Sequence, residues 1–113
     1  MGIPFLEFLP SQDIWQCQKC GTHLAYTKDM ISDEFHGKYG PALLFQTICN
    51  GKSYDRRRAG LSTGEFVIEN IKCRYCNSYV GWTYIKSFEA SEMYKVGKFI
   101  LEEEQIMLFG HCE

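Results

Sequence analysis

Two Cys-x-x-Cys pairs are the residues of this chain best suited to chemistry. The pairs are Cys17 with Cys20 and Cys73 with Cys76, with 52 residues between them in a chain of 113. Glycine follows the first pair and asparagine the second, as expected of tight turns that hold two sulfurs close together. Four thiolates from two such turns match the ligand set of a tetrahedral zinc ion. The sequence therefore predicts one structural Zn²⁺ that joins two distant parts of the chain.

A secreted disulfide scaffold is the main alternative for a short chain with six cysteines. The first ten residues lack a basic segment, and Glu7 and Pro10 interrupt their apolar run, so they do not resemble a signal peptide. No stretch is long and apolar enough to predict a membrane span. A disulfide within Cys-x-x-Cys is more often redox-active than structural. We therefore expect an intracellular protein that binds zinc and does not associate with membranes.

The two remaining cysteines have no partner at ligand spacing. Cys49 ends an apolar run, LLFQTIC, and is interpreted as a small buried hydrophobic residue. Cys112 follows His111 near the end of the sequence and is interpreted as part of a tail rather than as a nucleophile or a metal ligand.

Composition favours one domain with its own core and does not favour nucleic-acid binding. Hydrophobic residues make up 45% of the chain and aromatic residues 15%, which is enough for a core. The net charge is −2, whereas nucleic-acid binding needs a basic face. Arg56, Arg57 and Arg58 form one basic cluster, interpreted first as a solvated loop and second as a site where a partner docks. A nucleic-acid site would add Lys72 and Arg74 to them.

Strand-forming residues predominate along the chain. Strands are predicted at 23–26, from residue 30, and at 42–49, 66–72 and 79–84, where Gly81 would allow another strand to approach closely. In the segment 66–72, Phe66, Ile68 and Asn70 would share one face. A turn at Asn50 leads into the polar, glycine-containing segment 52–64, which is predicted to be a loop.

The last third of the chain is less regular. Residues 88–96 are predicted to form one or two helical turns, capped by Ser87 or Ser91 and ended by Gly97. Residues 98–106 are predicted to be a final strand, although the run from Glu102 to Glu104 favours a helix. The predicted fold is mainly β, with two small antiparallel sheets that each end in a cysteine turn and are pinned at one apex by a single zinc ion. The predicted divisions are an arm (1–13), the zinc-binding domain (14–108) and a tail (109–113).

These features together resemble the Yippee-like zinc-binding family. The resemblance covers about 15–106 and depends on the two cysteine pairs with their long spacing, together with residues on either side of the second pair: His23-Leu24, Thr63-Gly64, Gly81-Trp82, Tyr84, Tyr94, Gly97-Lys98-Phe99-Ile100 and Glu102. The chain departs from the family pattern in the arginine-containing segment 54–62 and at Thr83, where lysine is common.

The resemblance implies a β-tent fold related to the thalidomide-binding domain of cereblon and to methionine sulfoxide reductase B enzymes. It implies that Cys17, Cys20, Cys73 and Cys76 are the zinc ligands, and it carries over no catalytic residue. Members of the family are associated with the nucleus, the cytoplasm and the mitotic apparatus, and some with a multisubunit E3 ubiquitin ligase. A protein partner of that kind is therefore expected here.

Three functions are compatible with the sequence. A non-enzymatic binding module would use an aromatic pocket, predicted between the sheets from Trp82, Tyr84, Phe88 and Phe99. A methionine sulfoxide reductase is suggested by the segment 74–78, but Cys76 is already assigned to zinc, and a metal-bound thiolate is not free to attack a sulfoxide. A nucleic-acid-binding domain is opposed by the acidic composition. The binding module is the function that the sequence favours.

Overall fold

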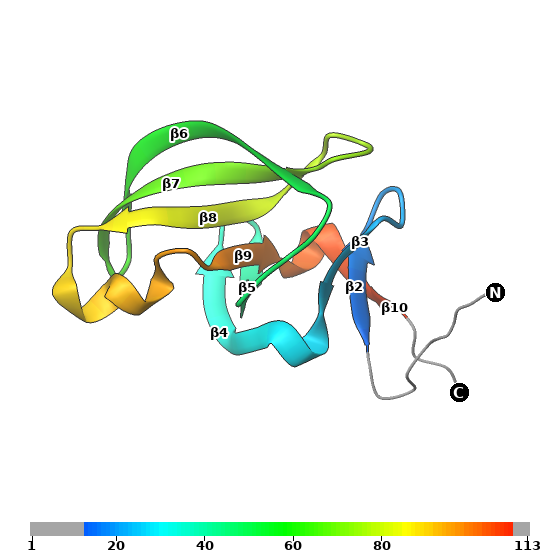
Figure 1. Ribbon diagram of the computed structural model, residues 1–113, viewed down its shortest axis with the longest axis horizontal. Helices are drawn as coiled ribbons and strands as arrows, with labels where there is room; N and C mark the ends of the chain where they lie inside the picture. The colour runs from blue at the N-terminus through cyan, green and yellow to red at the C-terminus, as the bar shows by residue number, and fades with distance from the viewer. Residues whose placement is uncertain (1–12, 110–113) are drawn as a thin grey trace.

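Two antiparallel β-sheets make up the described part of the computed structural model, residues 13–109 (Figure 1). The smaller sheet has the order β10-β2-β3, with β2 (Ile14–Cys17), β3 (His23–Tyr26) and β10 (Ile106–Phe109). The larger sheet has the order β4-β5-β9-β8-β7-β6, with β4 (Met30–Gly37), β5 (Gly40–Phe45), β6 (Gly51–Leu61), β7 (Gly64–Cys73), β8 (Tyr79–Ser87) and β9 (Phe99–Glu102). Short 3-10 helices are η1 (Thr27–Asp29), η2 (Ala90–Lys95) and η3 (Glu103–Gln105). The predicted mainly β fold with two antiparallel sheets is confirmed.

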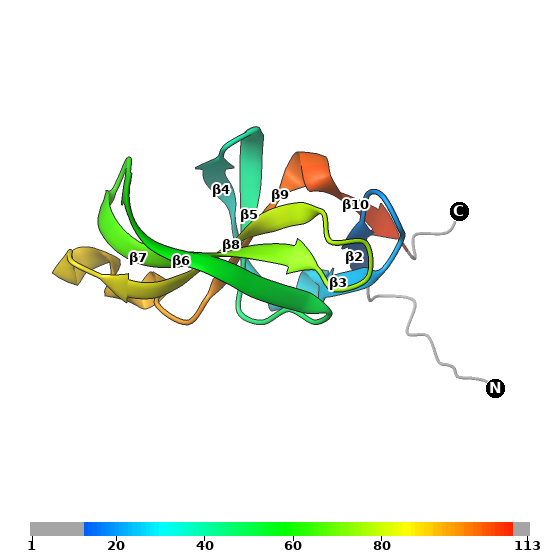
Figure 2. The same cartoon turned by 90° about the horizontal axis from the view of Figure 1, so that it is seen from above.

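Each sheet leads into one cysteine pair. Strand β2 of the smaller sheet ends at Cys17, and strand β7 of the larger sheet ends at Cys73. The loops that follow these two strands lie next to each other at one end of the molecule, at the opposite end from η2 (Figures 1 and 2). The two sheets therefore meet where the four sulfurs come together.

The larger sheet buries both of its faces near its centre. In β5, Leu43 and Phe45 pack toward the smaller sheet in one core cluster, whereas Ala42 and Leu44 belong to a second cluster on the opposite face. All four side chains are buried. A strand covered on both faces reads as a continuous apolar run, which is why ALLF shows no alternation in the sequence.

Strand β7 confirms the predicted alternation. Phe66, Ile68 and Asn70 are buried on one face, as expected. On the other face Glu69 is half-buried and Ile71 is buried, because Ile71 belongs to the core that the two sheets share and Glu69 does not. The smaller sheet thus covers only the end of β7 that leads to the cysteines.

Gly81 allows β8 and β9 to approach each other, as predicted. A Cβ atom at this position would overlap the backbone carbonyl oxygen of Ile100. Trp82, the next residue, pairs in register with Ile100, so the close approach lies directly beside the tryptophan.

The predicted loop at 52–64 is wrong, because most of it is strand β6. This strand lies at the edge of the larger sheet and pairs only with β7, from Gly51 opposite Cys73 to Leu61 opposite Gly64. An edge strand exposed to solvent carries polar side chains on both faces, which removes the alternation. A register shift between Tyr54 and Arg57, with Asp55 at a φ of 60°, breaks the pattern further.

Two other predicted strands end or divide earlier than expected. The strand predicted at 42–49 ends at Phe45, after which the chain crosses toward the smaller sheet and the backbone N–H of Cys49 donates to the carbonyl of Leu24. Cys49 is consequently exposed, which corrects its interpretation as a buried hydrophobic residue. The strand predicted at 98–106 is divided by η3, so that its two halves belong to different sheets.

The predicted helical turns are present as η2. Gly97 follows with a φ of 84°, as expected of a glycine that ends a helix. The predicted serine cap is wrong, because Glu89 precedes η2 and no side chain caps the helix. Ser87 instead binds the backbone of Glu89, accepting from its N–H at 3.1 Å and donating to its carbonyl at 2.8 Å. Residues 1–12 and 110–113, which include most of the predicted arm, part of the tail and Cys112, lie outside the described residues.

Candidate functional site

The four predicted zinc ligands come together in a single cluster. Their Sγ atoms all lie within 4.8 Å of one another. The Sγ atoms of Cys17 and Cys76 are 3.6 Å apart, and those of Cys20 and Cys73 are 3.5 Å apart. Zinc–sulfur bonds of about 2.3 Å in a tetrahedron place sulfurs about 3.8 Å apart. The spacing and the all-sulfur donor set therefore fit a tetrahedral Zn²⁺.

The first cysteine turn is held by its own backbone. The N–H of Gly21 donates to the carbonyl of Cys17 at 2.9 Å, and the N–H of Cys17 donates to the carbonyl of Thr22 at 2.7 Å. Gly21 has a φ of 81°, a left-handed conformation that glycine adopts without steric cost. The Thr22 hydroxyl lies 3.0 Å from the sulfur of Cys20. The N–H of Gln18, inside the turn, also donates to the carbonyl of Gln105 at 2.9 Å, so the turn presents both sulfurs while η3 holds it in place.

The second cysteine turn repeats this arrangement position by position. The N–H of Asn77 donates to the carbonyl of Cys73 at 2.9 Å, and the N–H of Cys73 donates to the carbonyl of Ser78 at 2.8 Å. Asn77, with a φ of 65°, takes the place that glycine has in the first turn. The Ser78 hydroxyl lies 2.9 Å from the sulfur of Cys76. Two equivalent turns from two sheets thus supply two sulfurs each.

The surroundings of the sulfurs divide them into two kinds. Hydrogen bonds from the side chain and backbone of Ser78 lower the pKa of the Cys76 thiol to about 6. Hydrogen bonds from Thr22 also lower the pKa of Cys20. Burial raises the pKa of Cys73 to about 11. The two exposed cysteines are therefore prepared to act as thiolates, whereas Cys73 needs a nearby positive charge, such as a metal ion, to lose its proton.

The larger sheet carries a cavity of about 810 Å³ on the face away from the smaller sheet. Its floor comes from β7 and β8, and β4, β6, the β6–β7 turn and η2 surround it. The side chains that line it include Phe35, Arg57, Asn70, Trp82, Tyr84 and Lys95. This position corrects the prediction of a pocket between the sheets, since the space between the sheets is filled by core side chains.

Only part of the predicted aromatic pocket lines the cavity. Trp82 and Tyr84 lie in its floor and are 7% and 2% exposed. Phe88 lies outside the cavity, exposed beyond the end of β8, with the Arg58 guanidinium 4.2 Å from its ring centroid. Phe99 packs against the core shared by the two sheets, because it points to the opposite face of β9 from Ile100. Phe88 and Phe99 are therefore removed from the candidate pocket.

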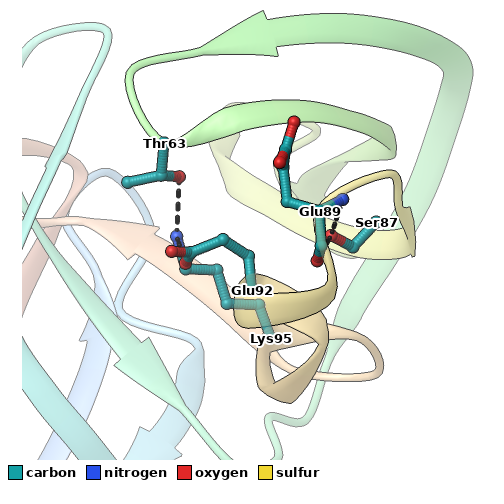
Figure 3. A network of polar contacts seen from close by, with 5 residues as sticks. All are labelled: Thr63, Ser87, Glu89, Glu92 and Lys95. Atoms are coloured by element: carbon teal, nitrogen blue, oxygen red, sulfur yellow. Dashed lines mark hydrogen bonds and ion pairs between the residues drawn. The ribbon is translucent and has the colours of Figure 1, made fainter.

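A buried lysine closes the cavity at the end formed by η2. Nζ of Lys95 donates to the hydroxyl of Thr63 at 2.8 Å and forms an ion pair with Glu92 at 2.9 Å (Figure 3). The lysine is 2% exposed. A Cβ atom at Gly64 would overlap the side chain of Glu89, so the β6–β7 turn and the segment before η2 also meet closely. These contacts explain why Thr63-Gly64 belongs to the sequence pattern.

The arginine cluster lies on strand β6 rather than in a loop. Arg56 pairs with Glu69 at 2.8 Å, and Arg58 pairs with Glu65 at 2.6 Å. Arg57 contacts Asp55 at 3.2 Å and the Asn70 side chain at 3.1 Å, and it lines the cavity. Each arginine therefore has an acidic neighbour, which reduces the positive field that a nucleic-acid site would need.

Sequence reasoning missed the polar residues of the cavity. Lys95 and Thr63 are 32 positions apart, and no local pattern indicates that they touch. Asn70 carried a usable signal, because it was the polar member of an otherwise apolar face of β7. A buried amide in such a place needs a partner, and that partner is Arg57.

A family profile described as "Yippee zinc-binding/DNA-binding /Mis18, centromere assembly" matches residues 14–111. The chain belongs to the Yippee/Mis18 family. A yippee-like protein of Solanum tuberosum is 40% identical over 106 residues, which cover 94% of this chain and 81% of that protein. Yippee-like 3 of Homo sapiens is 38% identical over 88 residues, covering 78% and 74%. These names denote no class of enzyme.

A solved structure extends the comparison to the fold. The crystal structure of the Mis18 "Yippee-like" domain superimposes with a TM-score of 0.71 at 14% identity, covering 88% of this chain and 96% of that one. This likeness shows a common Yippee-like fold.

Within residues 13–109, the helices are 3-10 segments of three to six residues, and none could span a membrane.

Proposed function

We propose that this member of the Yippee/Mis18 family is a non-enzymatic, zinc-stabilised recognition module that binds a protein partner or ligand through the cavity. The observation that carries the proposal is Trp82, which lines the cavity while no described residue accepts a hydrogen bond from its buried indole N–H. A buried N–H without a partner costs free energy that an acceptor on a bound molecule would restore. The volume of about 810 Å³ also lies in the range of ligand sites.

One structural Zn²⁺ per chain is part of this proposal. Four cysteine sulfurs complete a tetrahedral shell and leave no open position at which water could be activated. The zinc would therefore contribute to folding and not to a reaction. It would hold the end of β2 against the end of β7, and so fix the smaller sheet on the larger one.

We propose that the protein is an adaptor or subunit of a multisubunit E3 ubiquitin ligase. It would work in the nucleus, the cytoplasm or both. Its support is the family membership together with the association that the sequence resemblance implies. The cavity on the larger sheet would give such an adaptor a concave surface with which to contact a partner.

Affinity capture from native extract tests the role of the cavity. We expect Trp82→Ala to reduce capture of specific partners, ligase subunits among them, by at least about tenfold, the effect of losing roughly 1.4 kcal/mol. Phe88→Ala is the matched control, since Phe88 is also aromatic but is exposed and lies outside the cavity. Equal capture by wild type and a correctly folded Trp82→Ala variant would show that the cavity is not the binding site.

An assay with a methionine sulfoxide substrate and a thiol reductant tests the absence of enzymatic activity. The segment 74–78 is the second cysteine turn, and its Cys76 belongs to the sulfur cluster. We therefore expect no turnover. If the protein does turn over the substrate, and Cys49→Ser or Cys112→Ser abolishes that turnover, the protein is a thiol enzyme and the proposal of a non-enzymatic binding module is wrong.

A further inference from the structure

The aromatic side chains around the cavity already surround a positive charge. Nζ of Lys95 lies 5.0 Å from the ring centroid of Phe35, 5.3 Å from that of Phe66, 5.6 Å from that of Tyr84 and 5.8 Å from that of Tyr94. All four distances are within the range of cation–π attraction. An aromatic cage of this kind is typical of sites that bind ammonium groups, but here the protein's own lysine fills it.

A cationic ligand is therefore disfavoured in this cavity. It would have to approach Lys95 in a poorly hydrated place, where two like charges repel more strongly than in water. Displacing Lys95 would break its ion pair with Glu92 and its hydrogen bond with Thr63 and leave a buried carboxylate without its partner.

Hydrogen-bond donors of the residues that line the cavity outnumber the acceptors that pair with them. The indole N–H of Trp82 lies near the Tyr84 hydroxyl but makes no hydrogen bond of acceptable geometry with any described residue. Arg57 has five N–H donors, and its recorded contacts, to Asp55 and Asn70, both use the same terminal nitrogen. Glu92 is engaged by Lys95.

The exposed charged side chains at the rim do not reverse this balance. Lys38 is basic, Glu34 is acidic, and His36 lies between them in the sequence. Together with Arg57, Lys95 and Glu92, the cavity lining holds three fixed positive charges and two negative ones. Asp55 lies outside the lining but 3.2 Å from Arg57, and it offsets the remaining positive charge. The cavity is therefore distinguished by its hydrogen-bond donors and not by a net charge.

We propose that the cavity selects an anionic ligand, a carboxylate carried on an apolar or aromatic body. The carboxylate would accept from Arg57 and, once the buried indole shifts to expose its N–H, from Trp82. The body would lie against Tyr84 and Phe35. The inference rests on the proposed function of the cavity and adds the chemical class of what it binds. The carboxylate could belong to a free small acid or to an acidic side chain of a protein partner.

Nuclear magnetic resonance titration of the zinc-loaded protein tests the charge preference. The probes are 3-phenylpropanoate, the matched amide 3-phenylpropanamide and the matched cation 3-phenylpropylammonium. We expect the acid to shift the indole N–H resonance of Trp82 and to bind at least about tenfold more tightly than the amide, because hydrogen bonds to a charged acceptor are stronger. Equal binding of acid and amide, tighter binding of the cation, or no binding by the acid would overturn the inference.

Variants and peptides locate the contact and its source. Arg57→Gln and Trp82→Phe are each expected to weaken binding of the acid about tenfold, whereas Phe88→Leu, outside the cavity, should leave it unchanged. A doubly capped peptide Gly-Glu-Phe-Gly and its glutamine counterpart serve as the protein arm. Tighter binding of the glutamate peptide than of the free acid assigns the carboxylate to a partner side chain, and the reverse assigns it to a small acid.

The outcome for the ligand class is separate from the outcome for the proposed function. If acid and amide bind equally but Trp82→Ala still abolishes capture of partners, the cavity remains a recognition site and only the anionic preference is wrong. If Trp82→Ala leaves capture unchanged while the acid binds as expected, the cavity is an acid-binding site and the proposed adaptor role through it fails.

Discussion

The hydroxyl of Tyr79 donates a hydrogen bond of 2.6 Å to Oε2 of Glu102, a residue with no exposed surface. The same carboxylate accepts from the backbone N–H of Lys38 at 3.0 Å and of Tyr39 at 2.9 Å. Burial and the neighbouring carboxylate both raise the pKa of Tyr79. Three donors thus satisfy one buried carboxylate, and this side chain from β9 fixes the β4–β5 turn, next to the cavity rim, onto β8.

Replacement of this carboxylate tests its role. Glu102→Gln keeps the shape of the side chain but removes its charge. It also replaces one carboxylate oxygen, which accepts hydrogen bonds, with an NH₂ group that faces another donor. We expect the free energy of unfolding to fall by about 2 kcal/mol, measured as a lower urea midpoint with an unchanged slope. Glu103→Gln, at the exposed neighbouring position, is the control and should have little effect. Equal effects of the two substitutions would contradict the prediction.

Removal of the metal should unfold the protein. Structural zinc sites contribute roughly 10–16 kcal/mol of apparent binding free energy, as much as the whole stability of a typical domain. We expect elemental analysis to find about one zinc per chain, and chelation or the double change Cys17→Ser with Cys73→Ser to abolish the folded circular dichroism spectrum.

Cys49→Ser is the matched control for metal removal. Cys49 is an exposed cysteine outside the sulfur cluster, so its replacement should change neither the zinc content nor the fold. A double variant at Cys17 and Cys73 that binds no metal and still folds fully would show that the site is not structural.

The zinc cluster could be predicted from the sequence because each cysteine turn is specified locally. Residue spacing and the following Gly21 or Asn77 define each turn, and local backbone hydrogen bonds close it. One further backbone bond ties each turn to a distant segment, at Gln105 and at Asn50. Strand β7 could be predicted for a similar reason, since solvent and core alternate along it. What the sequence reports well is the environment of residues within one element.

The edge strand and the cavity could not be predicted, because they depend on contacts across the fold. Strand β6 pairs only with β7 and is polar on both faces, so its sequence resembles that of a loop. The division of 98–106 between two sheets is a property of the sheet arrangement and not of the residues alone. Phe88 and Phe99 were assigned to a pocket by their aromatic character, whereas the direction of each side chain is decided by strand pairing.

Buried Tyr84 should make stability sensitive to alkaline pH. Burial raises the pKa of its hydroxyl from 10.0 to about 12, because the folded protein disfavours the phenolate. The Tyr84 hydroxyl therefore ionises at a lower pH in the unfolded chain than in the folded protein. Its contribution to the free energy of unfolding is full below pH 10 and is lost as the pH rises toward 12. A pKa difference of about two between the folded and unfolded states corresponds to about 3 kcal/mol of unfolding free energy.

Tyr84→Phe removes this ionisation and provides the measurement. Between pH 10 and 12, wild type should lose about 2–3 kcal/mol more unfolding free energy than Tyr84→Phe in urea titrations at each pH. Tyr26→Phe is the control, since Tyr26 is 38% exposed, and it should follow wild type. Parallel curves for wild type and Tyr84→Phe across this range would rule out a buried, shifted hydroxyl.

Gly81 should tolerate no side chain, because β9 lies directly against it. A Cβ atom there would overlap the carbonyl oxygen of Ile100, which is backbone and cannot rotate away. We expect Gly81→Ala to lower the free energy of unfolding by about 3 kcal/mol or more, as overpacking against a rigid neighbour does. Gly60→Ala is the matched control, since a Cβ atom at Gly60 meets nothing within 4 Å. Because alanine also restricts the unfolded chain, Gly60→Ala should be neutral or slightly stabilising in the same urea experiment. Equal stabilities of the two variants would mean that β8 and β9 are not paired as described around Gly81.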